Sequence, residues 1–159
     1  MPKKILIVED DPLQLDMIRE ELDDHFKNVV LEDIQTEHEF YEKLSDIIRD
    51  PPDLILMDVM LRWTDPAPPE EMPSQPAEVE EEGYFRAGIR CVRRLRKQEQ
   101  TDPRIPILLF TVLSDQDLSQ DLLELKQDRY FRVAYLQKTA PVVDLISKIK
   151  EVAPVLQTP

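Results

Sequence analysis

The chain has 159 residues, 42% hydrophobic and 33% charged, with a formal net charge of −13, so it fits one globular domain that buries roughly 70% of its unfolded surface. The negative charge argues against a general nucleic-acid binder or a binder of anionic membranes, and no apolar run approaches the ~20 residues of a membrane span. The single cysteine, Cys91, excludes an internal disulfide and a cysteine metal cluster, which is typical of a protein of the reducing cytoplasm.

Two strand–helix units are predicted in the first third of the chain. Residues 4–8 form a short apolar run bounded by acids, which predicts a buried strand. Asp11 then predicts a helix N-cap with Pro12 at the first helical position, and residues 29–34 alternate like a half-exposed strand. A capping box predicts the start of the second helix. The capping box consists of Thr36 and Glu39. The apolar positions of the first helix are Leu15, Ile18, Leu22 and Phe26, and those of the second are Phe40, Leu44 and Ile47.

Three more units follow. Residues 53–57 predict the third strand, 105–110 the fourth and 132–136 the fifth. Ser114 predicts the cap of the helix after the fourth strand, and Pro141 predicts the start of the last helix. The apolar positions of the last three helices are Ile89, Val92, Leu95, Leu118, Leu122, Leu125, Val142, Leu145, Ile149 and Val152.

Five strand–helix units predict a parallel sheet that helices cover on both faces. The first, third and fourth strands are the most uniformly apolar, so they belong in the middle of the sheet. This arrangement suits a three-layer (βα)5 doubly wound α/β fold with the flavodoxin-like order 2-1-3-4-5, whose crevice lies beyond the carboxyl ends of the first and third strands. We expect one domain over residues 1–153 and a short tail over 154–159.

Polar groups follow four of these strands. Asp58 ends the third strand, in an apolar setting where an unpaired carboxylate shifts its pKa or finds a cation. Glu9 and Asp10 end the first strand, Thr111 ends the fourth, and Lys138 follows the fifth. The ends of parallel strands share one edge, where three carboxylates would repel one another unless a cation joined them. Carboxylate oxygens suit Mg²⁺, and a lysine and a hydroxyl beside it can hold a phosphoryl group.

The motifs "ILIVEDD", "LILMD", "LLFT" and "YLQK", at these strand ends, make the chain resemble the receiver domains of response regulators in two-component signalling. The resemblance spans nearly the whole chain. It implies that Asp58 is the phospho-acceptor, which takes a phosphoryl group from a histidine kinase or a histidine phosphotransfer protein. It also implies that Thr111 hydrogen-bonds to the phosphoryl group, that Lys138 forms an ion pair with it, and that Tyr135 is a switch aromatic that turns inward when Thr111 moves.

The resemblance further implies a magnesium site. Asp10 and Asp58 would bind Mg²⁺ directly, the backbone carbonyl of Met60 would be a third ligand, and Glu9 would bind the ion through water. Such a module promotes its own phosphorylation and dephosphorylation and is not a conventional enzyme. An aspartyl phosphohydrolase is disfavoured because it needs a second acid two residues after the nucleophile, where this chain has Met60. Flavin binding is disfavoured because the turn after the first strand is acidic and would repel a phosphate.

The chain departs from the receiver pattern after the third strand. Receiver domains have a loop of a few residues there, whereas this chain runs from Val59 to about Phe85 before the next helix. Residues 64–82 contain five prolines, seven acids and no base, so we predict an acidic, proline-rich insertion over about 62–84 that is mobile rather than ordered. We hypothesise that it leans against the bases of the following helix, with Trp63 as its anchor. Those bases are Arg90, Arg93, Arg94, Arg96 and Lys97.

A second departure follows Lys138. Receiver domains usually have a proline next, in a cis bond, and here the residue is Thr139. A cis bond before a residue other than proline costs about 3–4 kcal/mol, so this turn is expected to be strained or rearranged.

Two functions remain open at this point. The first is a phospho-accepting module without an output domain, which signals to an unknown downstream protein through the helix after Ser114, the fifth strand and the last helix. The same surface is a candidate for a homodimer. The alternative is a pseudo-receiver that binds its partner without phosphorylation, which the insertion and Thr139 favour and the intact acids and Lys138 disfavour.

Overall fold

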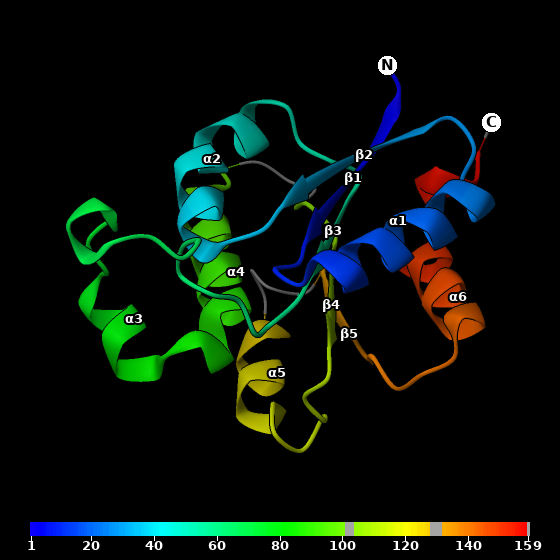
Figure 1. Cartoon of the computed structure of the whole chain (residues 1–159). Helices are drawn as coiled ribbons and strands as arrows, with labels where there is room; N and C mark the ends of the chain where they lie inside the picture. Colours follow the sequence, from blue (N-terminus) through cyan, green and yellow to red (C-terminus); the bar gives the residue numbers. More distant parts are fainter. Residues whose placement is uncertain (101–103, 128–131, 159) are drawn as a thin grey trace.

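The computed structural model describes residues 1–100, 104–127 and 132–158, and within them five parallel strands form one sheet in the order β2-β1-β3-β4-β5 (Figure 1). This confirms the predicted flavodoxin-like order. The strands β3, β4 and β5 begin one or two residues later than predicted. The bounds are β1 Lys3–Val8, β2 Val29–Ile34, β3 Leu54–Met57, β4 Ile107–Thr111 and β5 Val133–Gln137.

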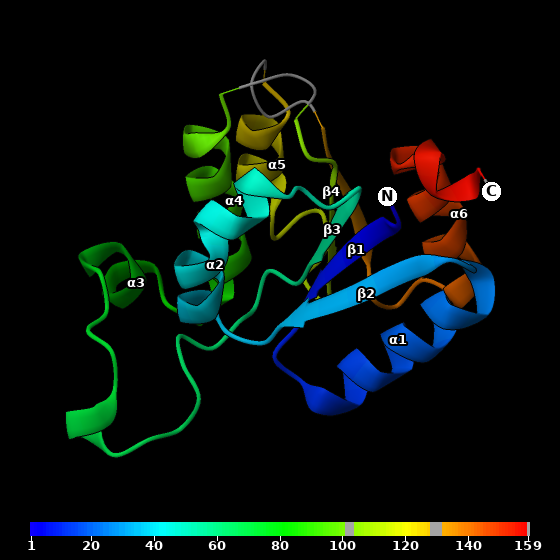
Figure 2. The ribbon, with the colours of Figure 1, turned by 90° about the horizontal axis from the view of Figure 1, so that it is seen from above.

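Helices cover both faces of the sheet, so the fold has three layers. The helices α1 and α6 pack on one face, and α2, α4 and α5 pack on the other, as two perpendicular views show (Figures 1 and 2). None of the helices described here is long and apolar enough to cross a membrane. Their bounds are α1 Pro12–His25, α2 Glu37–Arg49, α3 Ala77–Glu82, α4 Ala87–Gln98, α5 Ser119–Leu125 and α6 Val142–Val152.

The strand side chains alternate between two apolar clusters, one on each face of the sheet. In β1, Leu6 and Val8 pack toward α2 and α4, whereas Ile5 and Ile7 pack toward α1 and α6. All four side chains are at most 3% exposed. Successive strand residues point to opposite faces, so a central strand with both faces covered is apolar throughout. The same reason explains why β1, β3 and β4 form the middle of the sheet.

The predicted caps of the first two helices are present. Asp11 accepts hydrogen bonds from the amides of Leu13 and Gln14. Thr36 accepts one from the amide of Glu39 at 3.1 Å. The carboxylate of Glu39 accepts from the amide of Gln35, not from that of Thr36, so only half of the predicted capping box forms.

Two expectations about the later helices are wrong. Ser114 does not cap α5, because Ser114 and Asp117 bond to each other's amides and close a separate turn, and α5 begins only at Ser119. Val142 does not belong to the buried face of α6. It is 43% exposed in the first turn and lines a groove between α1 and α6, while Leu145 and Ile149 pack on the sheet.

The segment predicted to be a mobile insertion contains helical elements that the sequence did not predict. They are the 3-10 helix Pro69–Glu71, the helix α3, and the 3-10 helix Tyr84–Arg86. The segment lies outside α2 and α4, away from the sheet (Figures 1 and 2). Its mobility stays a prediction.

The two ends of this insertion are held side by side. Leu61 donates its amide to the carbonyl of Tyr84 at 3.2 Å, and Gly88 donates to the carbonyl of Val59 at 2.9 Å. These two bonds form a short stem between the loop after β3 and the start of α4. The insertion therefore leaves and re-enters the domain at one place.

The predicted tail also has contacts with the domain. Pro154–Gln157 form a 3-10 helix, and Leu156 is 4% exposed in the cluster shared with α1 and α6. The Lys3 amine donates to the Thr158 hydroxyl at 2.6 Å. Residue 159 lies outside the described residues.

Candidate metal and phosphoryl site

Backbone hydrogen bonds continue the sheet past its strands and set the position of the predicted site. The amide of Glu9 donates to Ile34 at 3.0 Å, and the amide of Asp58 donates to Val8 at 2.9 Å. The amide of Lys138 donates to the carbonyl of Thr111 at 2.8 Å. The residues that follow β1, β3 and β5 are thus tied to the same edge, as the parallel topology predicts.

Three carboxylates meet at this edge. Each of Glu9, Asp10 and Asp58 has a carboxylate oxygen within 4.8 Å of one from each of the others. Each carboxylate also accepts one backbone amide: Glu9 from Asp11 at 3.1 Å, Asp58 from Met60 at 3.2 Å, and Asp10 from Arg62 at 3.0 Å. These bonds fix the orientation of the three side chains.

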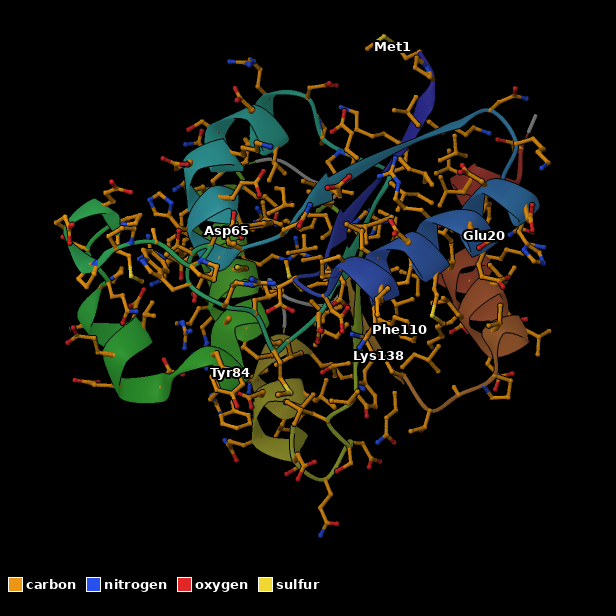
Figure 3. The ribbon with its side chains drawn as sticks, in the orientation of Figure 1. Met1, Glu20, Asp65, Tyr84, Phe110 and Lys138 are labelled. Carbon is orange, nitrogen blue, oxygen red and sulfur yellow. The ribbon has the colours of Figure 1, made fainter. Side chains whose placement is uncertain are left out.

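Lys138 reaches into this group of acids. Its ammonium donates to Glu9 at 2.6 Å and to Asp58 at 2.8 Å, and its side chain is only 9% exposed. On the way it passes Phe110, whose ring centre lies 5.9 Å from the ammonium, and the two residues lie together in Figure 3. The buried Asp58 carboxylate therefore has a cation partner, and the change to Thr139 does not turn Lys138 away from the site.

The electrostatics of the site follow from its burial. Burial, and then the nearby charge of Asp58, raise the pKa of Glu9 from 4.5 to about 7, against the opposing effect of Lys138. Burial by itself would lower the pKa of Lys138, but Asp58 and Glu9 outweigh it and the pKa is raised. Lys138 is therefore a fixed positive charge that two carboxylates share.

The donor set fits Mg²⁺. It consists of carboxylate oxygens alone, grouped closely enough to share one ion, and hard oxygen ligands in small number are what Mg²⁺ prefers in proteins. Lys138 binds Glu9 and Asp58 but not Asp10. The metal-binding roles of Asp10, Asp58, Met60 and Glu9 stay predictions.

Thr111 and Tyr135 contact the same backbone segment. Thr111 is fully buried at the end of β4, and its hydroxyl accepts the amide of Leu113 at 3.4 Å. The Tyr135 hydroxyl donates to the carbonyl of Leu113 at 2.6 Å. Thr111 and Tyr135, which the receiver resemblance treats as a switch, are therefore connected through the backbone of Leu113. The switch itself stays a prediction.

Arg62 belongs to the site, and the sequence did not predict it. Besides its backbone amide, its side chain contacts Asp10: Nη2 donates to the Asp10 carbonyl at 2.6 Å, and Nε lies 3.7 Å from the carboxylate. No motif signals this contact, because it depends on the path of the loop after β3.

Gly88 also supports the site without having been predicted. A Cβ at this position would lie 2.2 Å from the Asp58 carbonyl oxygen and 2.7 Å from Cα of Val59. Only glycine lets α4 approach the loop after β3 so closely. The sequence held a signal, because Gly88 is one of only two glycines and lies inside a helical pattern, where glycine is normally unfavourable.

The insertion contacts α4 as hypothesised, through some of the predicted bases. Glu78 pairs with Arg94 at 2.8 Å, and Trp63 donates its indole N–H to the Pro73 carbonyl at 3.1 Å. Arg93 lies 3.8 Å from Glu82. Two of the named bases do not take part: Arg96 binds Glu99 and the Ile105 carbonyl, and Lys97 is exposed.

A buried ion pair, unforeseen in the sequence, lies between the insertion and the core. Arg90 binds Glu37 through two bonds, Nε to Oε2 at 2.7 Å and Nη2 to Oε1 at 2.8 Å, with both side chains at most 2% exposed. The Arg90 Nη2 also donates to the Gly83 carbonyl at 2.8 Å. Tyr41 donates its hydroxyl to the same Glu37 carboxylate.

Comparison with solved structures defines the class of fold. The chain matches a CheY-like receiver domain protein from Methanospirillum hungatei with a TM-score of 0.62, 22% identity, and coverage of 99% of this chain and 98% of that one. It matches the chemotaxis protein CheY4 of Vibrio cholerae with a TM-score of 0.61, 20% identity, and coverage of 96% and 99%. No protein-family profile and no curated protein sequence matches the chain.

A third match bears on the acidic site. The receiver domain of a sensor histidine kinase from Pseudomonas aeruginosa, with a magnesium ion coordinated in its active-site cleft, has a TM-score of 0.60 and 18% identity, with coverage of 97% of this chain and 99% of that one. The chain therefore has the fold of response-regulator receiver domains over nearly its whole length. At these identities the fold is what the matches share.

Proposed function

We propose that this chain is a phospho-accepting receiver module, with Asp58 as the acceptor of a phosphoryl group. The observation that carries the proposal is the Lys138 ammonium, which binds Glu9 and Asp58 at the edge where the three carboxylates meet. A structural ion pair needs only one carboxylate per cation. Three acids against Lys138 and the partly exposed Arg62 leave one negative charge, which a divalent ion would neutralise.

The positions of the side chains support the following chemistry. A carboxylate oxygen of Asp58 attacks the phosphorus of a phosphohistidine, the new P–O bond forms as the P–N bond breaks, and the electron pair leaves with the imidazole. Asp10 and Asp58 would hold Mg²⁺, which would supply positive charge to the phosphoryl oxygens. Lys138 pairs with the added negative charge at Asp58, and the Thr111 hydroxyl hydrogen-bonds to the phosphoryl group.

The proposal extends to the partners. The donor is a histidine kinase or a histidine phosphotransfer protein of the cytoplasm, and the chain is its substrate rather than an enzyme of the usual kind. The signal passes to a downstream protein through the surface of α5, β5 and α6, where Tyr135 and Leu113 connect Thr111 to that surface.

Incubation with Mg²⁺ and acetyl phosphate tests the function. We expect the chain to gain one phosphoryl group, measured by intact mass, and the Asp58→Asn variant to gain none, because the amide is not a nucleophile. Asp24→Asn, at an exposed position on α1, is the control and should react like the wild type. No uptake by the wild type, or equal uptake by Asp58→Asn, would contradict the proposal and favour a module that binds without phosphorylation.

A further inference from the structure

Arg62 is a second cation at the acidic site, and among the three clustered acids it contacts Asp10, which Lys138 does not bind. Its Nη2 donates to the Asp10 carbonyl at 2.6 Å, and its Nε lies 3.7 Å from the Asp10 carboxylate oxygen that also accepts the Arg62 amide at 3.0 Å. A divalent ion that needs Asp10 as a ligand must therefore share this carboxylate with a guanidinium.

The position of Arg62 is set by its backbone. The amide of Glu37 donates to the carbonyl of Arg62 at 3.0 Å, and the amide of His38 donates to the carbonyl of Trp63 at 2.9 Å. These are the first amides of α2, which lack partners within their own helix and need acceptors from elsewhere. The loop is thus fixed to α2 by groups that no substitution at Arg62 removes.

The guanidinium is partly exposed to solvent, unlike the ammonium of Lys138. The Arg62 side chain is 38% exposed and lines a cavity of about 450 Å³ together with Asp10, Trp63 and Arg90. Its other ion-pair contact, to Asp65 at 3.9 Å, is with a side chain that is 78% exposed. Lys138, by contrast, is 9% exposed and holds two buried acids.

We propose that Arg62 competes with the divalent ion for Asp10 and so lowers the affinity of the site for Mg²⁺. This inference rests on the proposed function. The backbone amide of Arg62 keeps Asp10 in place when the side chain is removed, so the loss of the guanidinium removes positive charge without releasing the ligand. Arg62 is in this sense a residue that sets the concentration of Mg²⁺ at which the site fills.

The size of the effect follows from Coulomb repulsion. A unit charge a few ångströms from a divalent ion, largely screened by water and salt, changes the affinity about threefold to tenfold. Because the guanidinium is partly exposed, the difference should shrink as salt concentration rises.

The test is a Mg²⁺ titration followed by the NMR amide shifts of Asp10 and Met60, which reports binding without any phosphoryl transfer. We expect Arg62→Gln to bind Mg²⁺ about threefold to tenfold more tightly than the wild type. Arg62→Lys should bind more weakly than Arg62→Gln, because it keeps the charge. The matched control is Arg19→Gln, whose guanidinium has a similar exposure, 35%, and pairs with Asp33 at 2.7 Å.

The outcomes separate this inference from the function on which it rests. If the wild type binds Mg²⁺ and accepts a phosphoryl group, but Arg62→Gln binds Mg²⁺ equally or more weakly, the inference is overturned and the function stands. If neither protein shows a shift with Mg²⁺ and neither accepts a phosphoryl group, both are overturned. Tighter binding in Arg62→Gln and not in Arg19→Gln supports the inference.

Discussion

Two buried ion-pair clusters of this domain differ in how charge is matched. In the cluster of Arg90 and Glu37, one guanidinium meets one carboxylate through two parallel bonds. In the cluster of Lys138, one ammonium is divided between Glu9 and Asp58. Both arginine and lysine clusters are almost fully buried, so the difference does not come from solvent.

The contrast indicates which of the two clusters is suited to binding a cation. A one-to-one pair with two bonds satisfies its charges and stabilises the contact between α2, α4 and the insertion. A lysine shared by two acids, with Asp10 next to them, leaves excess negative charge, which costs free energy until a cation arrives. The first cluster is structural, and the second is the site proposed to accept Mg²⁺ and a phosphoryl group.

The largest expected effect on stability comes from breaking the Arg90–Glu37 pair. Arg90→Met leaves the buried Glu37 carboxylate without its guanidinium, and we expect a loss of about 3–5 kcal/mol in the free energy of unfolding, measured with urea. Adding Glu37→Gln should recover part of this loss, because it removes the stranded charge. Arg49→Met is the control, since Arg49 is 76% exposed in its pair with Asp46 and should change stability by less than about 1 kcal/mol. A double variant no more stable than Arg90→Met would contradict this account.

The next effect comes from the close contact between Gly88 of α4 and the backbone of the loop after β3. Gly88→Ala places a Cβ against the Asp58 carbonyl and Cα of Val59, and backbone atoms cannot give way as a side chain can. We expect a loss of about 3 kcal/mol in unfolding free energy, together with slower phosphoryl uptake. Gly83→Ala separates strain from crowding, because Gly83 has a φ of 73° but no atom within 4 Å of its added Cβ. Equal losses for the two variants would show that close approach at Gly88 is not the cause.

The smallest of these effects is a pH dependence of the free energy of unfolding that comes from Glu9, in the cluster of Lys138, Glu9 and Asp58. Burial and Asp58 raise the pKa of Glu9 from 4.5 to about 7, so between these values the folded chain holds a proton that the unfolded chain has released. In metal-free protein, the contribution of Glu9 to the free energy of unfolding should therefore fall by about 2.5 kcal/mol as the pH rises from 4.5 to 7.

Urea unfolding in EDTA at several pH values measures this slope. Glu9→Gln should flatten it, whereas Glu20→Gln, on the exposed face of α1 (Figure 3), should not. A slope that is unchanged in Glu9→Gln would assign the dependence to another group.

The sheet and four members of the site could be predicted from the sequence because each depends on local pattern. Apolar runs of strand length define β1, β3 and β4, and the polar residue after each run has to lie at the shared edge. Asp10, Asp58, Thr111 and Lys138 follow from that rule. The helix α5 was misplaced because Ser114 and Asp117 form a turn with the same residues that would cap a helix.

The remaining features depend on the path of one long segment. The Arg62 contact and the helix α3 require knowledge of where residues 62–84 run, and proline-rich acidic composition does not specify that path. The Arg90–Glu37 pair depends instead on how α4 packs against α2. Composition argued for a segment without regular structure, whereas Val79 and Trp63 are 5% and 8% exposed, which gives the segment apolar contacts of its own.

Two backbone hydrogen bonds, between Leu61 and Tyr84 and between Val59 and Gly88, form the stem of the insertion. Because this stem fixes both ends, the fold of the domain does not depend on how long the insertion is. When the two ends of a loop are held together, the entropic cost of closing the loop grows only with the logarithm of its length, by about 0.6 kcal/mol for each doubling. The exposed residues 66–72, which precede the contacts of Pro73, Glu78 and Val79 with the rest of the domain, therefore form a natural graft point. A recognition peptide or a reporter can be exchanged there while the two backbone hydrogen bonds of the stem hold the loop after β3 in place.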